Sequence, residues 1–289
     1  MEFLQPASWP EALAAKAAHP DALPIAGGTD VMVELNFDRR RPPALLDLGR
    51  VTELAEWGTD GDLLRVGAGV TYRRILDELA GRLPGLALAA RTVGSPQIRN
   101  RGTVGGNLGS ASPAGDALPP LLAAGALVEL ASAGGVRRVP VAEFCTGPKR
   151  SVRRPDELIA AVLVPTPAGP EQFAKVGTRN AMVIAVCSFA LALRPATRTA
   201  GTGIGSAGPT PLRAREAEEL LAAELPWHDR AALPAPVVDR FGDLVAAAAA
   251  PIDDVRGSAA YRRHALRVLA RRTLAWAWAQ HREGGDGCG

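Results

Sequence analysis

One segment, from Thr92 to Pro120, constrains the fold of this chain more than any other. It reads TVGSPQIRNRGTVGGNLGSASPAGDALPP and combines glycines, small hydroxyl residues, amides and one acid with few large apolar side chains. We therefore expect something other than apolar packing to order it. Glycine backbone can approach phosphate oxygens closely and turn successive N–H groups toward them. The segment thus indicates an anionic, nucleotide-like ligand, which Gly102, Gly105 and Gly106 would approach.

A second glycine motif lies nearer the N-terminus, where Pro24 to Val31 reads PIAGGTDV. Leu23 to Ala26 has the pattern of a short strand, and Thr29 or Asp30 can cap the helix that follows. A strand, a glycine turn and a helix N-terminus can hold a phosphate without a basic side chain. A Gly-Gly pair alone is more often a structural turn. The two motifs together suggest the two sides of one diphosphate.

Composition narrows the class of protein. The chain has 289 residues, of which 47% are apolar, enough for two folded domains with a substantial core. Its formal charge is only +3, and aromatic residues make up 4% of it. A nucleic-acid-binding surface combines a basic face with aromatic side chains, so this composition argues against one.

The cysteines and histidines predict no metal site in this chain. Cys145, Cys187 and Cys288 lie far apart and form no CxxC pair, which excludes an iron–sulfur cluster or a zinc ribbon built by this chain alone. The four histidines have no metal-ligand spacing. An odd number of cysteines without an export signal also favours a reducing compartment.

Two further features predict a cytoplasmic protein without membrane association. The N-terminus begins Met1-Glu2 and lacks the basic stretch that is typical of a signal peptide. The longest largely apolar run, from Ala181 to Leu193, has 13 residues. That is fewer than the roughly 20 residues that span a bilayer, so we interpret this run as a buried strand.

The hydrophobic pattern predicts short strands alternating with helices, and prolines divide them into domains. The proline-rich stretch Pro165 to Pro170 marks one boundary, and the polar cluster Gly58 to Gly61 marks a weaker one. We predict a domain over residues 1–168 with subdomains over about 1–58 and 59–168, a second domain over 169–283 and a flexible tail over 284–289. Strands are expected over 23–26, 45–48, 64–70, 126–131, 136–139, 158–164, 173–176, 183–193 and 198–204, and the longer helices over 10–18, 72–79, 86–91, 117–123, 215–223, 236–250 and 258–281.

Taken in order, AGGTD, QIRNRGTVGGN and SPAGD resemble the FAD-binding medium subunit of the molybdenum hydroxylases, the family of xanthine dehydrogenase and aerobic carbon monoxide dehydrogenase. The resemblance covers nearly the whole chain and is closest to bacterial xanthine dehydrogenase subunits. It implies an α+β chain with a two-subdomain FAD-binding fold of the PCMH type. A C-terminal domain of the CO dehydrogenase flavoprotein type, with a three-stranded sheet and three helices, would follow.

The resemblance also implies a set of FAD-binding residues. Backbone N–H groups and the hydroxyls of Thr29 and Thr103 would contact the pyrophosphate. Asp116 would bind a sugar or ribityl hydroxyl, because a carboxylate is a poor neighbour for phosphate, although it could instead cap the helix at Ala117. Lys175 would contact FAD, or it could form a salt bridge at a sheet edge. The full set comprises Pro24, Ile25, Ala26, Gly27, Gly28, Thr29, Asp30, Val31, Val93, Thr103, Val104, Gly105, Gly106, Asn107, Asp116, Ile159 and Lys175.

Two pairs of residues in this region each allow more than one interpretation. Val93 and Ile159 match positions that line the flavin ring, but any buried apolar residue would look the same. One of Arg99 and Arg101 could counter the diphosphate charge or pair with Asp116, and either could equally face solvent or another subunit.

The second half of the chain offers weaker signals. Near Arg179 the sequence resembles the family motif, but Met182 and Val183 replace its acids, which puts the use of NAD in doubt. Gly201 to Gly208 is predicted to be a strand end and turn, because prolines follow it where a dinucleotide loop needs a helix. The last helix carries three arginines along one face, Arg263, Arg267 and Arg271. By default we interpret this face as solvated. The alternative is that it docks an acidic subunit.

The resemblance finally implies a role in electron transfer. A molybdopterin-binding large subunit would oxidise the substrate, and a small subunit with [2Fe–2S] clusters would pass electrons to FAD on this chain. NAD or another acceptor would then receive them. Since the flavin performs the redox chemistry, we expect no catalytic residue here. Xanthine dehydrogenase, in purine catabolism, is the leading interpretation. A carbon monoxide or aldehyde dehydrogenase medium subunit, a stand-alone FAD-dependent reductase and a non-enzymatic basic interaction module are the alternatives.

Overall fold

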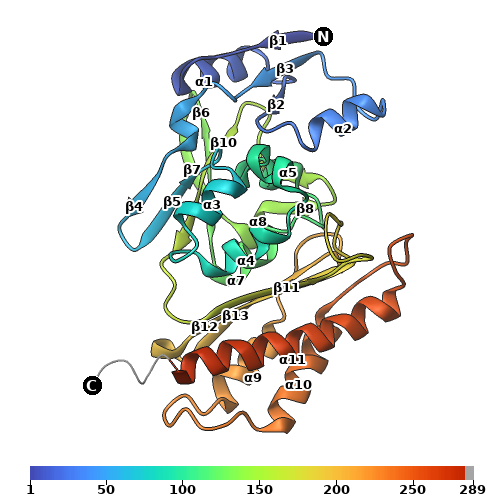
Figure 1. Cartoon of the computed structure of the whole chain (residues 1–289). Helices are drawn as coiled ribbons and strands as arrows, with labels where there is room; N and C mark the ends of the chain where they lie inside the picture. The colour runs from blue at the N-terminus through green and yellow to red at the C-terminus, as the bar shows by residue number, and fades with distance from the viewer. Residues whose placement is uncertain (284–289) are drawn as a thin grey trace.

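The computed structural model describes residues 1–283, which form three stacked parts from the N-terminal sheet to the C-terminal helices (Figure 1). One large cluster of buried side chains lies within residues 12–164, and a second lies within residues 187–278. The parallel sheet and the antiparallel sheets occur in separate parts of the chain, each with its own helices. This arrangement confirms the predicted α+β class.

The N-terminal part is a parallel sheet of order β1-β3-β2. Ser8 caps α1 by accepting a hydrogen bond from the N–H of Glu11. Strand β2 runs directly into the first glycine motif, so this motif lies at the carboxyl end of a parallel strand. The elements are β1 (Glu2–Leu4), α1 (Trp9–Ala18), β2 (Leu23–Ile25), α2 (Val31–Asn36) and β3 (Ala44–Asp47), followed by the 3-10 turn η1 (Thr52–Ala55).

The middle part is an antiparallel sheet of order β4-β5-β10-β6-β7 with helices packed against it (Figure 1). Residues 58–60, which the sequence predicted to be a polar turn, belong to strand β4, where Thr59 pairs with Leu64. The turn comes one step later, at Gly61 with φ +61°. The strands are β4 (Trp57–Asp60), β5 (Leu63–Gly67), β6 (Leu127–Ser132), β7 (Gly135–Pro140), β8 (Cys145–Gly147), β9 (Arg150–Ser151) and β10 (Leu158–Pro165). The helices are α3 (Tyr72–Glu78), α4 (Pro84–Thr92), α5 (Pro96–Arg101), α6 (Val104–Ser110), α7 (Leu118–Ala124) and α8 (Val141–Phe144).

The C-terminal part is a three-stranded antiparallel sheet with three helices, as the resemblance implied. The buried strand expected from residue 183 begins only at Cys187. Met182 and Ile184 are 57% and 61% exposed, because Arg179 donates hydrogen bonds to the carbonyls of Ala181 and Met182 and folds this stretch into a loop. The elements are β11 (Glu171–Val176), β12 (Cys187–Arg194), β13 (Thr199–Gly205), α9 (Arg215–Glu224), α10 (Ala235–Ala248) and α11 (Ala259–Glu283), with the 3-10 turn η2 (Pro195–Thr197).

A row of glycines on β13 receives helix α7 and joins the middle part to the C-terminal part. A Cβ at Gly201 would lie 2.0 Å from the carbonyl oxygen of Ala123, and one at Gly203 would lie 2.0 Å from that of Pro119. Only glycine permits this approach of helix and strand backbones. The prediction that Gly201 to Gly208 forms a strand end and turn is therefore confirmed, and packing explains its glycines.

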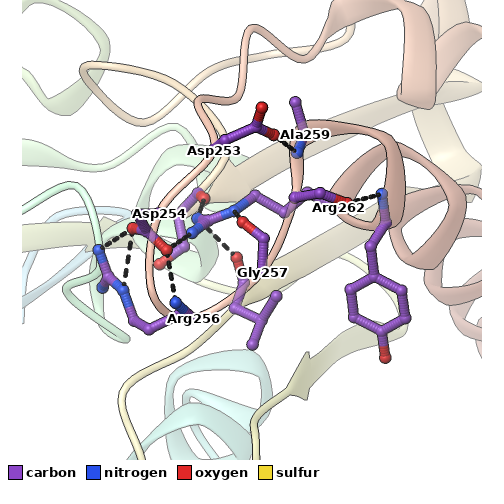
Figure 2. Close-up of polar contacts among 10 residues, drawn as sticks. Asp253, Asp254, Arg256, Gly257, Ala259 and Arg262 are labelled. Atoms are coloured by element: carbon purple, nitrogen blue, oxygen red, sulfur yellow. Dashed lines mark hydrogen bonds and ion pairs between the residues drawn. The ribbon is translucent and has the colours of Figure 1, made fainter.

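A buried arginine on α11 ties three backbone segments together, as Figure 2 shows. Arg262 is 2% exposed. It donates to the carbonyl oxygens of Val186, at 2.9 Å, and Ser206, at 2.5 Å, and pairs with Asp254 at 2.5 Å. The N–H of Ser206 in turn donates to the carbonyl of Pro113 at 2.8 Å. Arg262 therefore supports a contact that reaches the segment before Asp116.

The arginine face of α11 is solvent-exposed at Arg263 and Arg267, as expected, and it also forms ion pairs with α10. Arg267 pairs with Asp243 at 2.6 Å and Arg271 with Asp239 at 3.0 Å, both on α10. Two of the three arginines thus hold α10 against α11. Within residues 1–283, no helix combines the length and the apolar composition needed to cross a membrane. The predicted tail over 284–289 lies outside the described residues.

Candidate functional site

Both glycine motifs line a single cavity of about 540 Å³ between the N-terminal and middle parts. This volume lies within the usual range for small-molecule and cofactor pockets. Gly28 and Gly106, which are distant in sequence, both face it. The structure therefore places the two glycine motifs at one cleft, as predicted.

The motifs brace each other across the cavity. A Cβ at Gly27 would lie 1.8 Å from the carbonyl oxygen of Arg101, so the first motif packs directly on the residue before the second. The hydroxyl of Ser110 donates to Asp30 at 2.6 Å. Asp30 occupies the N-cap position of α2, but its side chain makes no capping hydrogen bond. Its carboxylate holds the second motif instead of the helix.

The first motif presents backbone N–H groups that have no partner. Within the described residues, no hydrogen bond uses the amides of Gly27, Gly28 or Thr29. Gly28 has φ +76°, a left-handed conformation that favours glycine. Successive unpaired amides in such a turn form an anion-binding surface. This motif matches the expectation for a diphosphate contact.

The second motif differs from the expectation, because its amides already have protein partners. The N–H of Gly105 donates to Ala68 at 3.0 Å, and that of Gly106 to the hydroxyl of Thr103 at 2.9 Å. The amide of Gly102 likewise donates to Ile98. A Cβ at Gly105 would lie 2.4 Å from that of Ala68, whereas at Gly106 it would meet only the Thr103 hydroxyl, at 3.0 Å. Gly105 is thus needed for packing, and Gly106 leaves room on the cavity side.

The segment around the second motif is also more helical and more buried than its composition suggested. Thr103 caps α6, and α5 precedes it. Val104 and Leu108 are both 0% exposed and belong to the main core. The inference that apolar packing could not order this segment was therefore wrong in part. A few apolar residues at helical spacing anchor it, while its glycines serve the cavity.

An ion pair lies behind the cavity wall. Lys175 Nζ donates to Asp116 Oδ2 at 2.7 Å and to the carbonyl of Thr92 at 2.9 Å. The side chains of Lys175 and Asp116 are 7% and 11% exposed. Asp116 makes no cap bond to α7, so that alternative is excluded. Arg99 donates to the carbonyl of Val93, at 3.0 Å, and Lys175 rather than either nearby arginine pairs with Asp116.

Asp116 keeps one oxygen free. Burial raises the pKa of this carboxyl group, and the charge and hydrogen bond of Lys175 lower it again. Its Oδ1 is buried and has no hydrogen-bond partner within the described residues. The side chain of Asn107 accepts from the N–H of Ala117 at 3.3 Å, which fixes the turn that carries Asp116. Asp116 is therefore held in place by Lys175, with its second oxygen buried outside the residues that line the cavity.

The predicted residues divide into a lining group and a supporting group. Ile25 and Val104 point into the hydrophobic clusters, and Asp116 and Lys175 stand behind the wall. The lining group comprises Pro24, Ala26, Gly27, Gly28, Thr29, Asp30, Val31, Val93, Thr103, Gly105, Gly106, Asn107 and Ile159.

The cavity also includes residues that sequence reasoning missed. Ile98 lies within the QIRN motif, so its position alone could have suggested it. The others reach the cavity from distant segments, with no local signal. Lys149, for example, forms an ion pair with Glu34 of α2, so the hairpin β8–β9 meets α2 at the cavity. The missed residues include Leu48, Leu54, Tyr72, Ile98, Lys149 and Arg153.

These features fit a flavin dinucleotide. Unpaired amides at Gly27 to Thr29 suit a diphosphate, and the open side of Gly106 allows close approach. Val93 and Ile159 supply apolar wall for a flat ring. Within the described residues, no cluster of histidine, cysteine or acidic side chains could hold a metal ion.

Comparisons with known protein families match the two halves of the chain separately. Residues 1–167 match the FAD binding domain in molybdopterin dehydrogenase. Residues 172–277 match the CO dehydrogenase flavoprotein C-terminal domain.

Individual relatives cover three quarters or more of the chain. The putative xanthine dehydrogenase FAD-binding subunit of Escherichia coli is 31% identical over 91% of each chain. The carbon monoxide dehydrogenase medium chain of Afipia carboxidovorans is 30% identical over 90% of each. The nicotinate dehydrogenase FAD-subunit of Eubacterium barkeri is 31% identical over 76% of this chain and 79% of its own.

Solved structures share the fold. Reconstituted CO dehydrogenase from Oligotropha carboxidovorans superposes with a TM-score of 0.89 and 28% identity, over 97% of this chain and 98% of that one. Quinoline 2-oxidoreductase from Pseudomonas putida superposes with a TM-score of 0.88 and 26% identity, over 96% of this chain and 97% of that one. These similarities confirm the two-part fold that the motifs implied.

Proposed function

This chain belongs to the family of FAD-binding medium subunits of molybdenum hydroxylases, and on that premise we propose that it carries electrons within a xanthine dehydrogenase complex. The observation that carries the proposal is the single cavity on which Gly28 and Gly106 converge. FAD, when bound, supplies the redox chemistry, and the protein binds and orients it.

Different residues of the chain bind different parts of FAD in this proposal. The unpaired amides of Gly27 to Thr29 hold the diphosphate, and Gly106 lets it approach the backbone. Asp116, fixed by Lys175, supports the cavity wall from behind. Val93 and Ile159 shield the flavin ring from water. No side chain of the site needs to act as a nucleophile or general base.

The proposed partners follow from the relatives. A molybdopterin-binding large subunit oxidises the substrate, and a small subunit with [2Fe–2S] clusters passes electrons to this chain. We propose NAD as the final acceptor, although the stretch after Arg179 lacks the acids of the family motif. Xanthine is the proposed substrate because the motifs resemble those of bacterial xanthine dehydrogenase subunits, one of which is 31% identical over 91% of both chains.

Co-purification of the complex tests this proposal. We expect this chain to carry FAD without iron or molybdenum when isolated, and xanthine to bleach its flavin only when both partners are present. A complex that oxidises carbon monoxide or an aldehyde but not xanthine would contradict the assignment of xanthine as the substrate. Turnover by the isolated chain would favour a stand-alone reductase, and a chain that takes up no FAD would favour an interaction module.

A further inference from the structure

The charged side chains that line the cavity are unbalanced. Within the described residues, four of them are cationic and only two are acidic, Asp30 and Glu34. A pocket with an excess of positive charge favours an anionic ligand. Each phosphate of the FAD diphosphate carries a negative charge, so the diphosphate can balance this excess. The four cations are Arg40, Lys149, Arg150 and Arg153.

The arginines that the sequence suggested as a counter-charge do not line the cavity. Arg99 and Arg101, beside the second glycine motif, are absent from its wall within residues 1–283. Arg99 instead donates hydrogen bonds to the carbonyls of Val93 and Gly94. A cation for the diphosphate must therefore come from another segment of the chain.

Three of the four cations lie on residues 149–153, which the fold fixes between the two glycine motifs. The N–H of Lys149 donates to the carbonyl of Ala111 at 2.9 Å, at the end of α6. The side chain of Lys149 pairs with Glu34 of α2. Helix α6 carries the second glycine motif and α2 follows the first, so residues 149–153 connect the two sides of the cavity.

Arg153 differs from the other cations because its charge has no partner. Arg40 and Lys149 both pair with Glu34, and Arg150 is exposed to solvent. Arg153 is only partly exposed, and it makes no ion pair with any residue that the structure describes. Its guanidinium donates one long hydrogen bond, of 3.3 Å, to the carbonyl of the residue before Leu158.

The acidic side chain of Glu157 does not neutralise Arg153, because other donors engage it. It accepts hydrogen bonds from Arg137 at 2.6 and 2.9 Å and from the N–H of Arg154 at 2.7 Å. Burial lowers the pKa of the Arg153 guanidinium, and the like charge of Arg40 lowers it further, but an arginine stays protonated at neutral pH. A sheltered cation without a counter-charge is unfavourable, and an anion in the cavity removes that penalty.

The guanidinium of Arg153 also lies on the same wall as α6. The carbonyl that it contacts immediately precedes Leu158 and Ile159, which line the cavity. Ile159 faces α6, since its Cδ1 lies 3.7 Å from the position of a Cβ at Gly109. Arg153 is therefore accessible to a ligand that lies along the second glycine motif.

A phosphate is the chemical group that suits this cation. Arginine presents a planar fork of N–H donors that matches phosphate oxygens and forms charge-assisted hydrogen bonds with them. We propose that Arg153 binds the diphosphate of FAD and supplies its counter-charge, together with the unpaired amides of Gly27 to Thr29. This inference rests on the proposed binding of FAD and adds a residue that lies in neither glycine motif.

The test compares Arg153→Gln, which removes the charge, with Arg153→Lys, which keeps it. Arg154→Gln is the matched control, because Arg154 is exposed and does not line the cavity. We expect Arg153→Gln to weaken binding of FAD, and of ADP, which also contains a diphosphate, by about 10- to 100-fold, the effect of one lost hydrogen bond to a charged group. Arg153→Lys should recover most of this loss, and Arg154→Gln should stay within about twofold of wild type.

Two further measurements separate a charge contact from a structural role. Added salt should weaken FAD binding to the wild-type chain more than to Arg153→Gln, because salt screens the contact that the variant has lost. The melting temperature of FAD-free Arg153→Gln should equal that of wild type or exceed it, because the substitution breaks no ion pair within residues 1–283.

The outcomes that would overturn the inference differ from one another. FAD affinity of Arg153→Gln within about twofold of wild type would remove Arg153 from the site and leave the proposed function intact. A loss for FAD but not for ADP would assign the guanidinium to the flavin half. An equal loss in Arg153→Lys and Arg153→Gln, with unchanged salt dependence, would indicate stacking on adenine instead. A lower melting temperature in both FAD-free variants would indicate a structural role. If the wild-type chain took up no FAD, the proposed function would fall together with this inference.

Discussion

Lys175 Nζ lies 2.7 Å from Asp116 Oδ2, so an ion pair joins the first strand of the C-terminal sheet to the turn after the second glycine motif. Both side chains are largely buried, and Lys175 also holds the carbonyl of Thr92, next to the cavity residue Val93. The packing of the C-terminal part against the middle part thus sets the position of a residue behind the cavity wall.

Removing the lysine should cost stability as well as affinity. Lys175→Met leaves the Asp116 carboxylate buried without a counter-charge, so we expect the free energy of unfolding to fall by about 3 kcal/mol. FAD affinity should fall too, because Lys175 also holds the carbonyl of Thr92, next to Val93 of the cavity wall. Chemical denaturation and FAD titration measure the two effects. The double variant Lys175→Met/Asp116→Asn should recover part of the stability, and no recovery would mean that the ion pair is not the cause.

The same pair predicts a dependence on pH. Burial raises the folded-state pKa of Asp116 above its unfolded value, and loss of Lys175 would raise it further. Between these two pKa values the unfolded chain binds fewer protons than the folded one, so stability falls as pH rises. Denaturation of Lys175→Met between about pH 4 and pH 7 should show a steeper fall than wild type. Parallel curves for the two proteins would refute the assignment, and Asp116→Asn in the same background should flatten the fall.

Gly106 offers the cleanest steric test of the cavity. A Cβ at this position meets only the Thr103 hydroxyl, at 3.0 Å, and Gly106 lines the cavity, so Gly106→Val should weaken FAD binding by about 100-fold or more and change stability by about 1 kcal/mol or less. Gly58→Val is the control, because a Cβ there meets no atom within 4 Å and Gly58 lies on β4, outside the cavity. Full flavin content in Gly106→Val would remove the second motif from the site.

Arg262 should matter both for folding and, at a distance, for the site. Arg262→Met leaves two buried carbonyls without this donor and removes one of the two arginines that pair with Asp254, the other being Arg256, so unfolding free energy should fall by about 3 kcal/mol. Because Ser206 contacts Pro113, FAD affinity should also decrease. The neighbouring Arg263 is exposed, and Arg263→Met should change stability by about 0.5 kcal/mol or less. Equal effects of the two substitutions, measured by thermal unfolding, would contradict the role of the Arg262 hydrogen bonds shown in Figure 2.

Sequence reasoning located the cavity but could not assign its parts. The order of strand β2, glycine turn and helix α2 is local, and so are the helices of the C-terminal part, so hydrophobic pattern and turn residues predicted them. Gly105 and Gly106 look identical in sequence. Their different roles depend on Ala68, which only the folded chain brings to Gly105.

Long-range contacts account for the other misses. Lys175 was predicted as an FAD contact or a salt bridge at a sheet edge, and the structure shows the salt bridge, from the edge strand β11. Its partner Asp116 could not be identified from sequence, because the two residues meet only when α7 docks on β13. Strand β4 was missed because Gly58 and Asp60 are typical turn residues, and pairing with β5 overrides that tendency. Arg153 follows a short strand and looks like an ordinary surface arginine until the fold places it on the cavity wall.

A structure of this chain with FAD bound tests the central claim most directly. The account predicts the diphosphate within hydrogen-bond distance of the amides of Gly27 to Thr29 and of the Arg153 guanidinium, and in contact with the open side of Gly106. A flavin bound elsewhere, with the cavity between Gly28 and Gly106 filled only by water, would contradict it.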